Sequence, residues 1–176
     1  MLAQVPVADK TQEIAGAQQL VQRVPLTGRV VTADALHGHP GFARSIRDQG
    51  RQYLLAIKEN EPQTYAALVQ YFADPDAVTQ EASSRDRQRG RIEQRTLRTS
   101  TELNAYLKRF PDLAQVAYIR RVVQDQTGRH EEVRYFVTSC PPTEADALRL
   151  LALIRGQWSV ESGHWIRDEV FGEDRS

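Results

Sequence analysis

The spacing of apolar residues between positions 29 and 58 predicts a strand, a helix and a second strand. Residues 29–34 (RVVTAD) form a short β-branched run that ends on an acid. Residues 52–58 (QYLLAIK) are almost continuously apolar, which is typical of a buried parallel strand. Pro40 suits the first turn of the helix between them, and Gly50 suits its C-terminal cap. Such a crossover predicts two parallel strands in one sheet.

Further elements are predicted on either side of this unit. Residues 2–8 alternate loosely like a strand, and residues 9–24 carry apolar positions at helical spacing. Asp9 and Gln12 have the spacing of a capping box at the start of that helix. Residues 62–72 predict another helix, opened by a proline.

The second half of the chain is rich in β-branched residues and ends in a helical pattern. It predicts a loop over residues 74–86 and a strand over residues 91–99. A hairpin around the turn sequence DQTG follows over residues 113–139, and a helix over residues 143–171. The loop prediction rests on a polar segment with a proline and no apolar period. Thr143 and Asp146 resemble a capping box at the start of the last helix.

Composition limits the class of protein. The 176 residues are 40% hydrophobic and 26% charged, an ordinary balance for one globular domain. A formal net charge of zero argues weakly against a nucleic-acid partner, although arginines cluster locally. One cysteine, Cys140, allows no internal disulfide and indicates a reducing cytoplasm. The sequence contains neither a long apolar run nor a signal-peptide pattern, so we expect no membrane contact.

The first candidate site lies where the two predicted parallel strands end. Asp34 follows the first strand, and Lys58 and Asn60 follow the second. Because sites in open α/β sheets form at the carboxyl edge of the strands, we expect these three residues to lie close together. The alternative is that Asp34 is a loop acid that caps the next helix.

The second candidate site lies on the last helix. Its predicted apolar stripe consists of Leu148, Leu151, Ile154, Trp158 and Trp165. Glu161 lies three residues after Trp158, so it should point from that stripe, where an unpaired carboxylate costs several kcal/mol. His164 and Asp168 share its face as secondary candidates. The alternative is that Glu161 lies at the edge of the stripe and pairs with an arginine.

An arginine-rich segment between residues 85 and 95 is the third candidate. In an extended chain, Arg91, Glu93 and Arg95 share one face, and two arginines there can bind phosphates. A solvated Arg–Glu–Arg ladder is the alternative interpretation.

Six segments, taken in order, resemble a known family. They are VADKTQEI (7–14), TADALH (32–37), LAIKEN (55–60), GRIEQR (90–95), QWSVE (157–161) and FGED (171–174). The chain resembles the DDE transposases of bacterial insertion sequences, in the ISAs branch of the IS-four group. The similarity extends over essentially the whole chain.

The resemblance implies a fold and a chemistry. It implies an RNase H-like α/β domain over residues 1–176, a mixed sheet with flanking helices, and a β-rich insertion at about 74–140 before the last helix. Three carboxylates of the family hold two divalent metals, Mg²⁺ or Mn²⁺, that cut and rejoin DNA. The second acid corresponds to Asp34 and the third to Glu161. The first lies upstream of this chain, so we expect the N-terminal strands to be missing and the chain alone to be inactive.

The same resemblance implies the partners. They are the DNA of element ends and target, with Lys58, Asn60, Arg91 and Arg95 as expected contacts. A homodimer is the assembly considered for the complete transposase, and the expected location is the bacterial cytoplasm, at the nucleoid. Three alternatives remain open: a metal-dependent nuclease of the same fold, a non-catalytic DNA-binding remnant, and a generic α/β binding domain.

Overall fold

The computed structural model describes residues 16–17, 29–88 and 90–166, with the side chains of the last helix described as far as Trp158. Gly16 and Ala17 are helical, within the helix predicted for residues 9–24. The rest of that helix, the predicted strand at 2–8 and the predicted end of the last helix at Phe171 lie outside the described residues.

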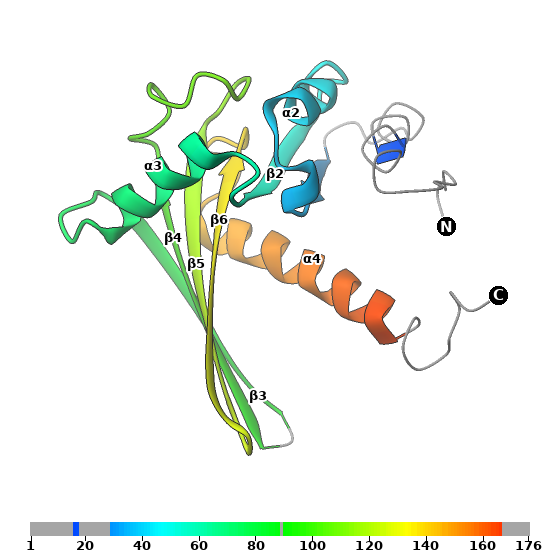
Figure 1. Cartoon of the computed structure of the whole chain (residues 1–176), viewed down its shortest axis with the longest axis vertical. Coiled ribbons are helices and arrows are strands. Elements are labelled where there is room, and N and C mark those ends of the chain that lie inside the picture. Colours follow the sequence, from blue (N-terminus) through cyan, green and yellow to red (C-terminus); the bar gives the residue numbers. More distant parts are fainter. Residues whose placement is uncertain (1–15, 18–28, 89, 167–176) are drawn as a thin grey trace.

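A six-stranded mixed sheet forms the centre of the described part, in the order β1-β2-β6-β5-β4-β3 (Figure 1). Its strands are β1 (Val30–Ala33), β2 (Gln52–Ile57), β3 (Gln80–Gln88), β4 (Arg91–Ser100), β5 (Gln115–Asp125) and β6 (Gly128–Thr138). Only the β1–β2 pair is parallel, and β2 continues into antiparallel pairing with β6. The predicted α/β class and the predicted parallel pair are confirmed.

The crossover between the parallel strands follows local rules. Helix α2 (Pro40–Arg47) begins with Pro40, and the ring nitrogen Nδ1 of His39 accepts a hydrogen bond from the Phe42 N–H at 3.1 Å. At the other end, Gly50 has a φ of +66°, and the N–H groups of Gly50 and Arg51 bond to the carbonyls of Arg47 and Ile46. This is a Schellman termination, which explains why the sequence has glycine there.

Side chains of the sheet alternate between two hydrophobic cores, one on each face. Leu55 and Ile57 of β2 pack with α2 and α3 (Pro62–Ala73), whereas Leu54 and Ala56 pack with α4 (Ala147–Ile166). Figure 1 shows α3 and α4 on opposite sides of the strands. Since β2 is buried on both faces, its near-continuous apolar sequence is accounted for.

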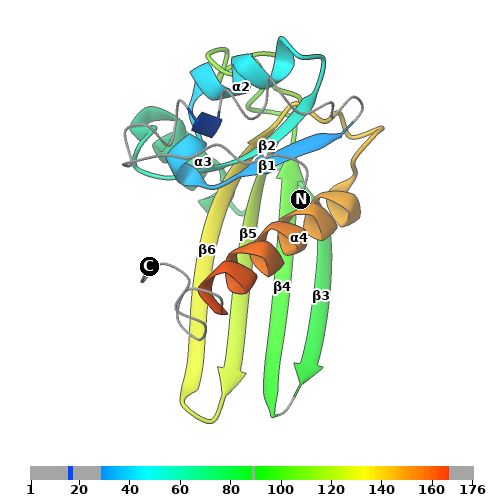
Figure 2. The same ribbon diagram turned by 90° about the vertical axis from the view of Figure 1, so that its right-hand side faces the viewer.

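Strands β3 to β6 extend past the helices as a long arm (Figures 1 and 2). The hairpin of β5 and β6 is confirmed, but the loop predicted over 74–86 is wrong from Gln80 onward, because β3 pairs with β4 along its whole length. Ala82, Ser84 and Asp86 alternate with exposed neighbours. In this edge strand, burial alternates from one residue to the next, but nearly all of the residues are polar. A search for alternating apolar residues therefore does not detect it.

The last helix begins later than predicted. Asp146 caps it, with Oδ1 accepting from the Arg149 N–H at 2.8 Å, whereas Thr143 lies within a turn in which the Pro141 carbonyl accepts from Glu144 and Ala145. The predicted apolar stripe is also corrected. Leu148 is 64% exposed, and the buried positions are instead Ala147, Leu150, Leu151 and Ile154, with Trp158 partly buried against them.

Three arginines of the arm surround Trp158 of α4, and we call this group the arginine–tryptophan cluster. The guanidinium carbons of Arg95, Arg121 and Arg134 lie 5.7, 5.4 and 5.2 Å from the centroid of the Trp158 ring. Cations over an indole face are attracted by its quadrupole. The cluster therefore fastens the middle of α4 to three neighbouring strands, β4, β5 and β6.

Acidic side chains neutralise these arginines. Glu93 bonds to Arg95 at 2.6 Å and also to Arg121, while Glu132 bonds to Arg121 at 3.2 Å and to Arg134 at 2.6 Å. Asp86 bonds to Arg95 at 2.6 Å and to Arg155 of α4 at 3.0 Å. Burial alone would raise the pKa of Glu132, but the hydrogen bonds and charges of Arg134 and Arg121 lower it overall. The carboxylate consequently stays ionised and the network stays paired.

We expect Trp158→Ala to destabilise the chain by about 2 kcal/mol. The value is below the roughly 3–5 kcal/mol for a fully buried aromatic residue, since the ring is only partly buried. Trp158→Phe keeps an aromatic face over the arginines and should cost less than half as much. Urea unfolding followed by circular dichroism measures both variants. Equal losses would show that the ring's face toward the arginines contributes nothing.

A pH-dependent loss of stability is expected from His39. Burial lowers its pKa below the usual 6.5, against a smaller raising effect of Glu61, and only the neutral ring can accept the Phe42 N–H. Because the unfolded state takes up a proton that the folded state resists, stability should fall as pH drops below about 6.5. The slope can reach about 1.4 kcal/mol per pH unit until the folded-state pKa is reached.

The variant His39→Asn retains a capping acceptor but cannot titrate, so it serves as the control. Unfolding free energies in urea at pH 5 to 8 should fall less steeply for the variant than for the wild type. Parallel curves would assign the acid sensitivity to other groups.

Candidate functional site

Asp34 directly follows β1, at the carboxyl end of the parallel pair. It is exposed and caps the short 3₁₀ turn η1 (Ala35–His37), with Oδ1 accepting from the Leu36 N–H at 3.1 Å. Asp34 is thus a capping acid, but of a short turn that the sequence did not predict, and His39 caps helix α2. Capping uses one carboxylate oxygen, and within the described residues Oδ2 makes no hydrogen bond, so it can meet a ligand from solvent.

Lys58 and Asn60 lie beside Asp34, as the strand order predicted. The amide nitrogen Nδ2 of Asn60 donates to the carbonyls of Ala35 at 2.7 Å and Gly38 at 3.3 Å. Its oxygen Oδ1 accepts from the Lys58 N–H at 3.3 Å. Asn60 therefore ties the end of β2 to the turn that carries Asp34, and these bonds give its side chain a positioning role at this edge.

Gly38 was not identified from the sequence, yet it fixes this edge. A Cβ on Gly38 would lie 1.9 Å from the carbonyl oxygen of Ala56, well inside any allowed contact. Only glycine lets the turn after Asp34 press directly against β2. No local pattern in the sequence predicts this contact, because its partner Ala56 is known only from the fold.

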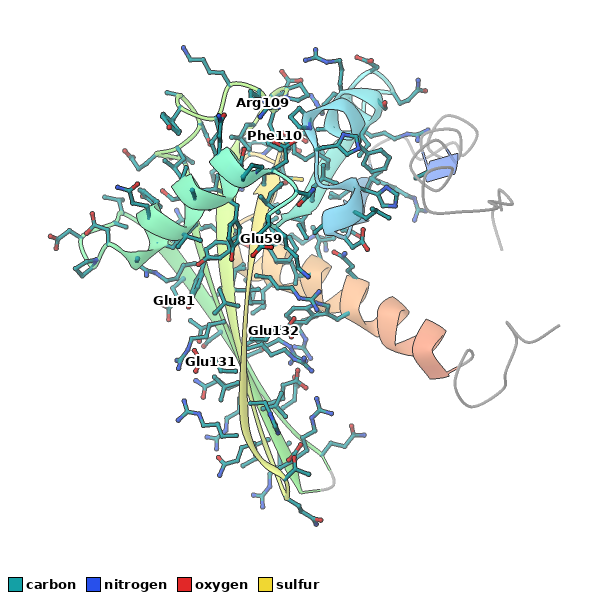
Figure 3. All side chains as sticks on the ribbon, in the orientation of Figure 1. Glu59, Glu81, Arg109, Phe110, Glu131 and Glu132 are labelled. Carbon is teal, nitrogen blue, oxygen red and sulfur yellow. The ribbon has the colours of Figure 1, made fainter. Side chains whose placement is uncertain are left out.

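A pocket of about 260 Å³ lies at this edge. Its lining includes Asp34, Lys58, and Arg134 from β6. A second pocket, of about 160 Å³, shares Lys58 and Arg134 and adds Glu59, which Figure 3 labels. Hard oxygen donors suit divalent cations such as Mg²⁺, and guanidinium and ammonium groups suit phosphate oxygens. The edge therefore offers both kinds of group within one small hollow.

Arg134 is a site residue that the sequence analysis missed. It enters the pocket because β6 pairs antiparallel with β2, in the register Ile57 to Tyr135. Its guanidinium nitrogen Nε bonds to Glu132 at 2.6 Å, and its guanidinium carbon lies 5.2 Å from the Trp158 ring. One side chain thus links the Asp34 pocket to the last helix. No short motif in the sequence could predict a contact that depends on strand pairing.

Glu161 follows Trp158 by three residues on α4, so its backbone lies about one turn beyond the cluster. Its side chain and that of His164 are outside the described residues, and so is the whole of Asp168. The expected proximity of the Asp34 and Glu161 carboxylates stays a prediction. Among the residues whose side chains are described, no group of three or more His, Cys, Asp or Glu could hold a metal.

Arg91 and Arg95 share one face of β4 with Glu93, as expected. Arg91 is 49% exposed at its side chain and lies 3.7 Å from Glu93. Arg95 is only 11% exposed and bonds to both Glu93 and Asp86. For Arg95, these ion pairs support the ladder interpretation rather than a phosphate contact. DNA contact by Arg91 stays a prediction.

No helix within the described part is long and apolar enough to cross a membrane.

Comparison with known proteins identifies relatives of this chain. It is 25% identical over 185 residues to "H repeat-associated putative transposase YhhI" of Escherichia coli (strain K12), across 99% of this chain and 48% of that protein. "Putative transposase YncI" of Escherichia coli O157:H7 is 25% identical over 186 residues, across 100% of the chain and 47% of that protein. "Putative protein YbfL" of strain K12 matches at 25% identity over 185 residues, with 99% and 48% covered. The chain thus spans about half the length of the curated relatives it matches.

Solved structures add nothing to this comparison. The sugar N-methyltransferase KedS8 from Streptoalloteichus aligns over 78% of this chain and 38% of its own, at 12% identity and a TM-score of 0.29, a value too low to bear on fold or function. The sequence comparison is decisive, because the family model described as "Transposase DDE domain" matches residues 1–176, and the chain belongs to that family.

Proposed function

We propose that this chain takes part in DNA transposition, by metal-dependent strand cleavage and strand transfer within an RNase H-like catalytic domain. The observation that supports it most is the family match over all 176 residues. The geometry at the edge of the sheet is consistent with it: Asp34 follows a parallel strand, beside a pocket that also contains Lys58 and Arg134. Transposases act on DNA, so a hollow that combines a carboxylate with two cations suits a phosphodiester substrate.

Asp34 and Glu161 are the proposed ligands of a divalent cation, Mg²⁺ or Mn²⁺. Asp34 fits this role, because its carboxylate is exposed and only one oxygen is used in capping. When bound, a pair of such cations stabilises the attacking and leaving oxygens of phosphoryl transfer. The chain's own contribution is to orient Asp34 through the turn that Asn60 and Gly38 hold against β2. The complete protein is proposed to supply the remaining carboxylate.

Other residues of the chain are proposed to bind and position the substrate. Lys58 and Arg134 line the pocket and would meet phosphate oxygens there, while Arg91 would meet them on the arm. Asn60 would act through the turn, and Arg95 through the arginine–tryptophan cluster. His164 and Asp168 remain secondary candidates on the last helix.

The test is Glu161→Gln in the complete transposase. This nearly isosteric change removes a charge that holds the metal, so DNA cleavage should fall by more than the roughly 10- to 100-fold typical of residues that only orient a ligand. Folding should be unaffected. Cleavage is measured as metal-dependent nicking of labelled DNA that bears the element's ends, and joining is measured as strand-transfer product on a target plasmid.

Glu59→Gln is the matched control, because Glu59 is exposed at the same edge and has no proposed role in chemistry. Cleavage that persists in Glu161→Gln would return Glu161 to a structural role. Metal-dependent cleavage by the wild type without any joined product would favour the nuclease alternative.

A further inference from the structure

The face of the arm on the side of α3 is open beyond the helices. Paired residues of antiparallel strands point to the same side, so the register defines this face. One row crosses it as Arg87, Ile92, Gln124 and Arg129, and the next row begins with Arg85. Arg85, Arg87 and Arg129 are all exposed. Beyond the ends of the helices, no described element covers this part of the sheet (Figures 1 and 2).

The two faces of the arm differ in how their charges are paired. On the α4 side, the arginines are bound to Asp86, Glu93 and Glu132. On the open side, Glu131 pairs with Arg120 through two hydrogen bonds of 2.6 and 2.7 Å. Figure 3 labels Glu131 and Glu132, neighbours on β6 that point to opposite sides of the arm.

The remaining arginines of the open face have positive charge in excess. Neither Arg85 nor Arg87 has an ion pair among the described residues, and Arg129 lies in the field of Glu131, which Arg120 already binds. After Glu131 is set against Arg120, three positive charges remain on this surface. Nearer to α3, Glu81 lies opposite Arg98 and leaves no excess.

The spacing of these charges suits a groove of duplex DNA. Arg87 and Arg129 are three strands apart in one row, so their Cα atoms are separated by roughly 14 Å at the usual strand spacing of about 4.8 Å. The phosphate ridges of a B-DNA major groove are separated by about 12 Å. Arg85 lies two residues before Arg87, roughly 7 Å along the strand, which adds a second contact along one ridge. Between Arg87 and Arg129, the row contains a branched apolar side chain, Ile92, and an uncharged amide, Gln124.

We infer that the open face of the arm, through Arg85, Arg87 and Arg129, is a docking surface for the phosphate backbone of duplex DNA. This surface is separate from the Asp34 pocket and lies on the opposite side of the sheet from α4. The choice of DNA as the partner rests on the proposed function, but binding at this surface requires neither the proposed metal ligands nor strand cleavage. It also differs from the segment Arg91–Arg95, whose charges face α4.

The experiment measures binding of the full 176-residue chain to a fluorescent 30-base-pair duplex, by anisotropy, in EDTA and across a salt series. Three phosphate contacts predict a slope of log affinity against log salt near −2.7, which is roughly a 40-fold loss between 50 and 200 mM salt. The variant Arg85→Gln/Arg87→Gln/Arg129→Gln should flatten the slope by about two to three units. Without divalent metal, the result does not depend on Asp34 or Glu161, so it can fail or succeed independently of the proposed chemistry.

Two further variants make the outcome decisive. Arg44→Gln/Lys108→Gln/Arg149→Gln removes the same charge from exposed positions elsewhere and should leave the slope unchanged. Arg85→Lys/Arg87→Lys/Arg129→Lys keeps the charge and should keep the slope, even if the glutamine variant folds poorly. Equal losses in the arm variant and the control, a flat slope in the wild type, or loss of the slope in the lysine variant would overturn the inference.

Discussion

The burial of β2 on both faces is the constraint on which the rest of the structure depends. One face of β2 is covered by α2 and α3 and the other by α4, and its two edges pair with β1 and β6. The strand therefore joins two parts that differ in strand direction: the parallel crossover that carries Asp34, and the antiparallel arm that carries Arg134. Displacement of β2 would separate these two residues, since no other described strand pairs with both parts.

A second level of organisation is electrostatic. Removing one partner from a partly buried ion network leaves an uncompensated charge, which costs more than the intact pair contributes. The arm meets this condition on its α4 side by alternating acids with arginines and by placing Trp158 over three of them. Such a network specifies where α4 lies on the sheet better than apolar contacts alone, because ion pairs and ring faces have preferred geometries. Arg134 belongs both to this network and to the pocket, so a shift of the network would also move a residue that lines the pocket.

Local chemistry in the sequence was sufficient for some elements and not for others. The parallel crossover was predictable, because a β-branched run, an N1 proline and a cap glycine each act within a few residues. So was the grouping of Asp34 with Lys58 and Asn60, which follows from strand direction alone. β3 was not predictable, since a polar edge strand has no apolar period. Arg134 and Gly38 were not either, because their roles depend on pairing with β2. The later start of α4 follows from the turn at Pro141. Leu148 is exposed because the buried face of the helix runs through Ala147, Leu150, Leu151 and Ile154.

Arginines are paired with acids on the α4 side of the arm and are in excess on the other side. Ionic strength should therefore affect the attachment of α4 and the binding of a polyanion differently. Exposed charges are screened within about 8–10 Å at physiological salt, whereas partly buried pairs are screened much less. The inner network, with Arg95 11% and Glu93 14% exposed, should therefore persist at concentrations that release a polyanion from the outer arginines. With charges arranged in this way, a four-stranded ribbon can keep a helix on one side at salt concentrations that would release the DNA proposed for the other side.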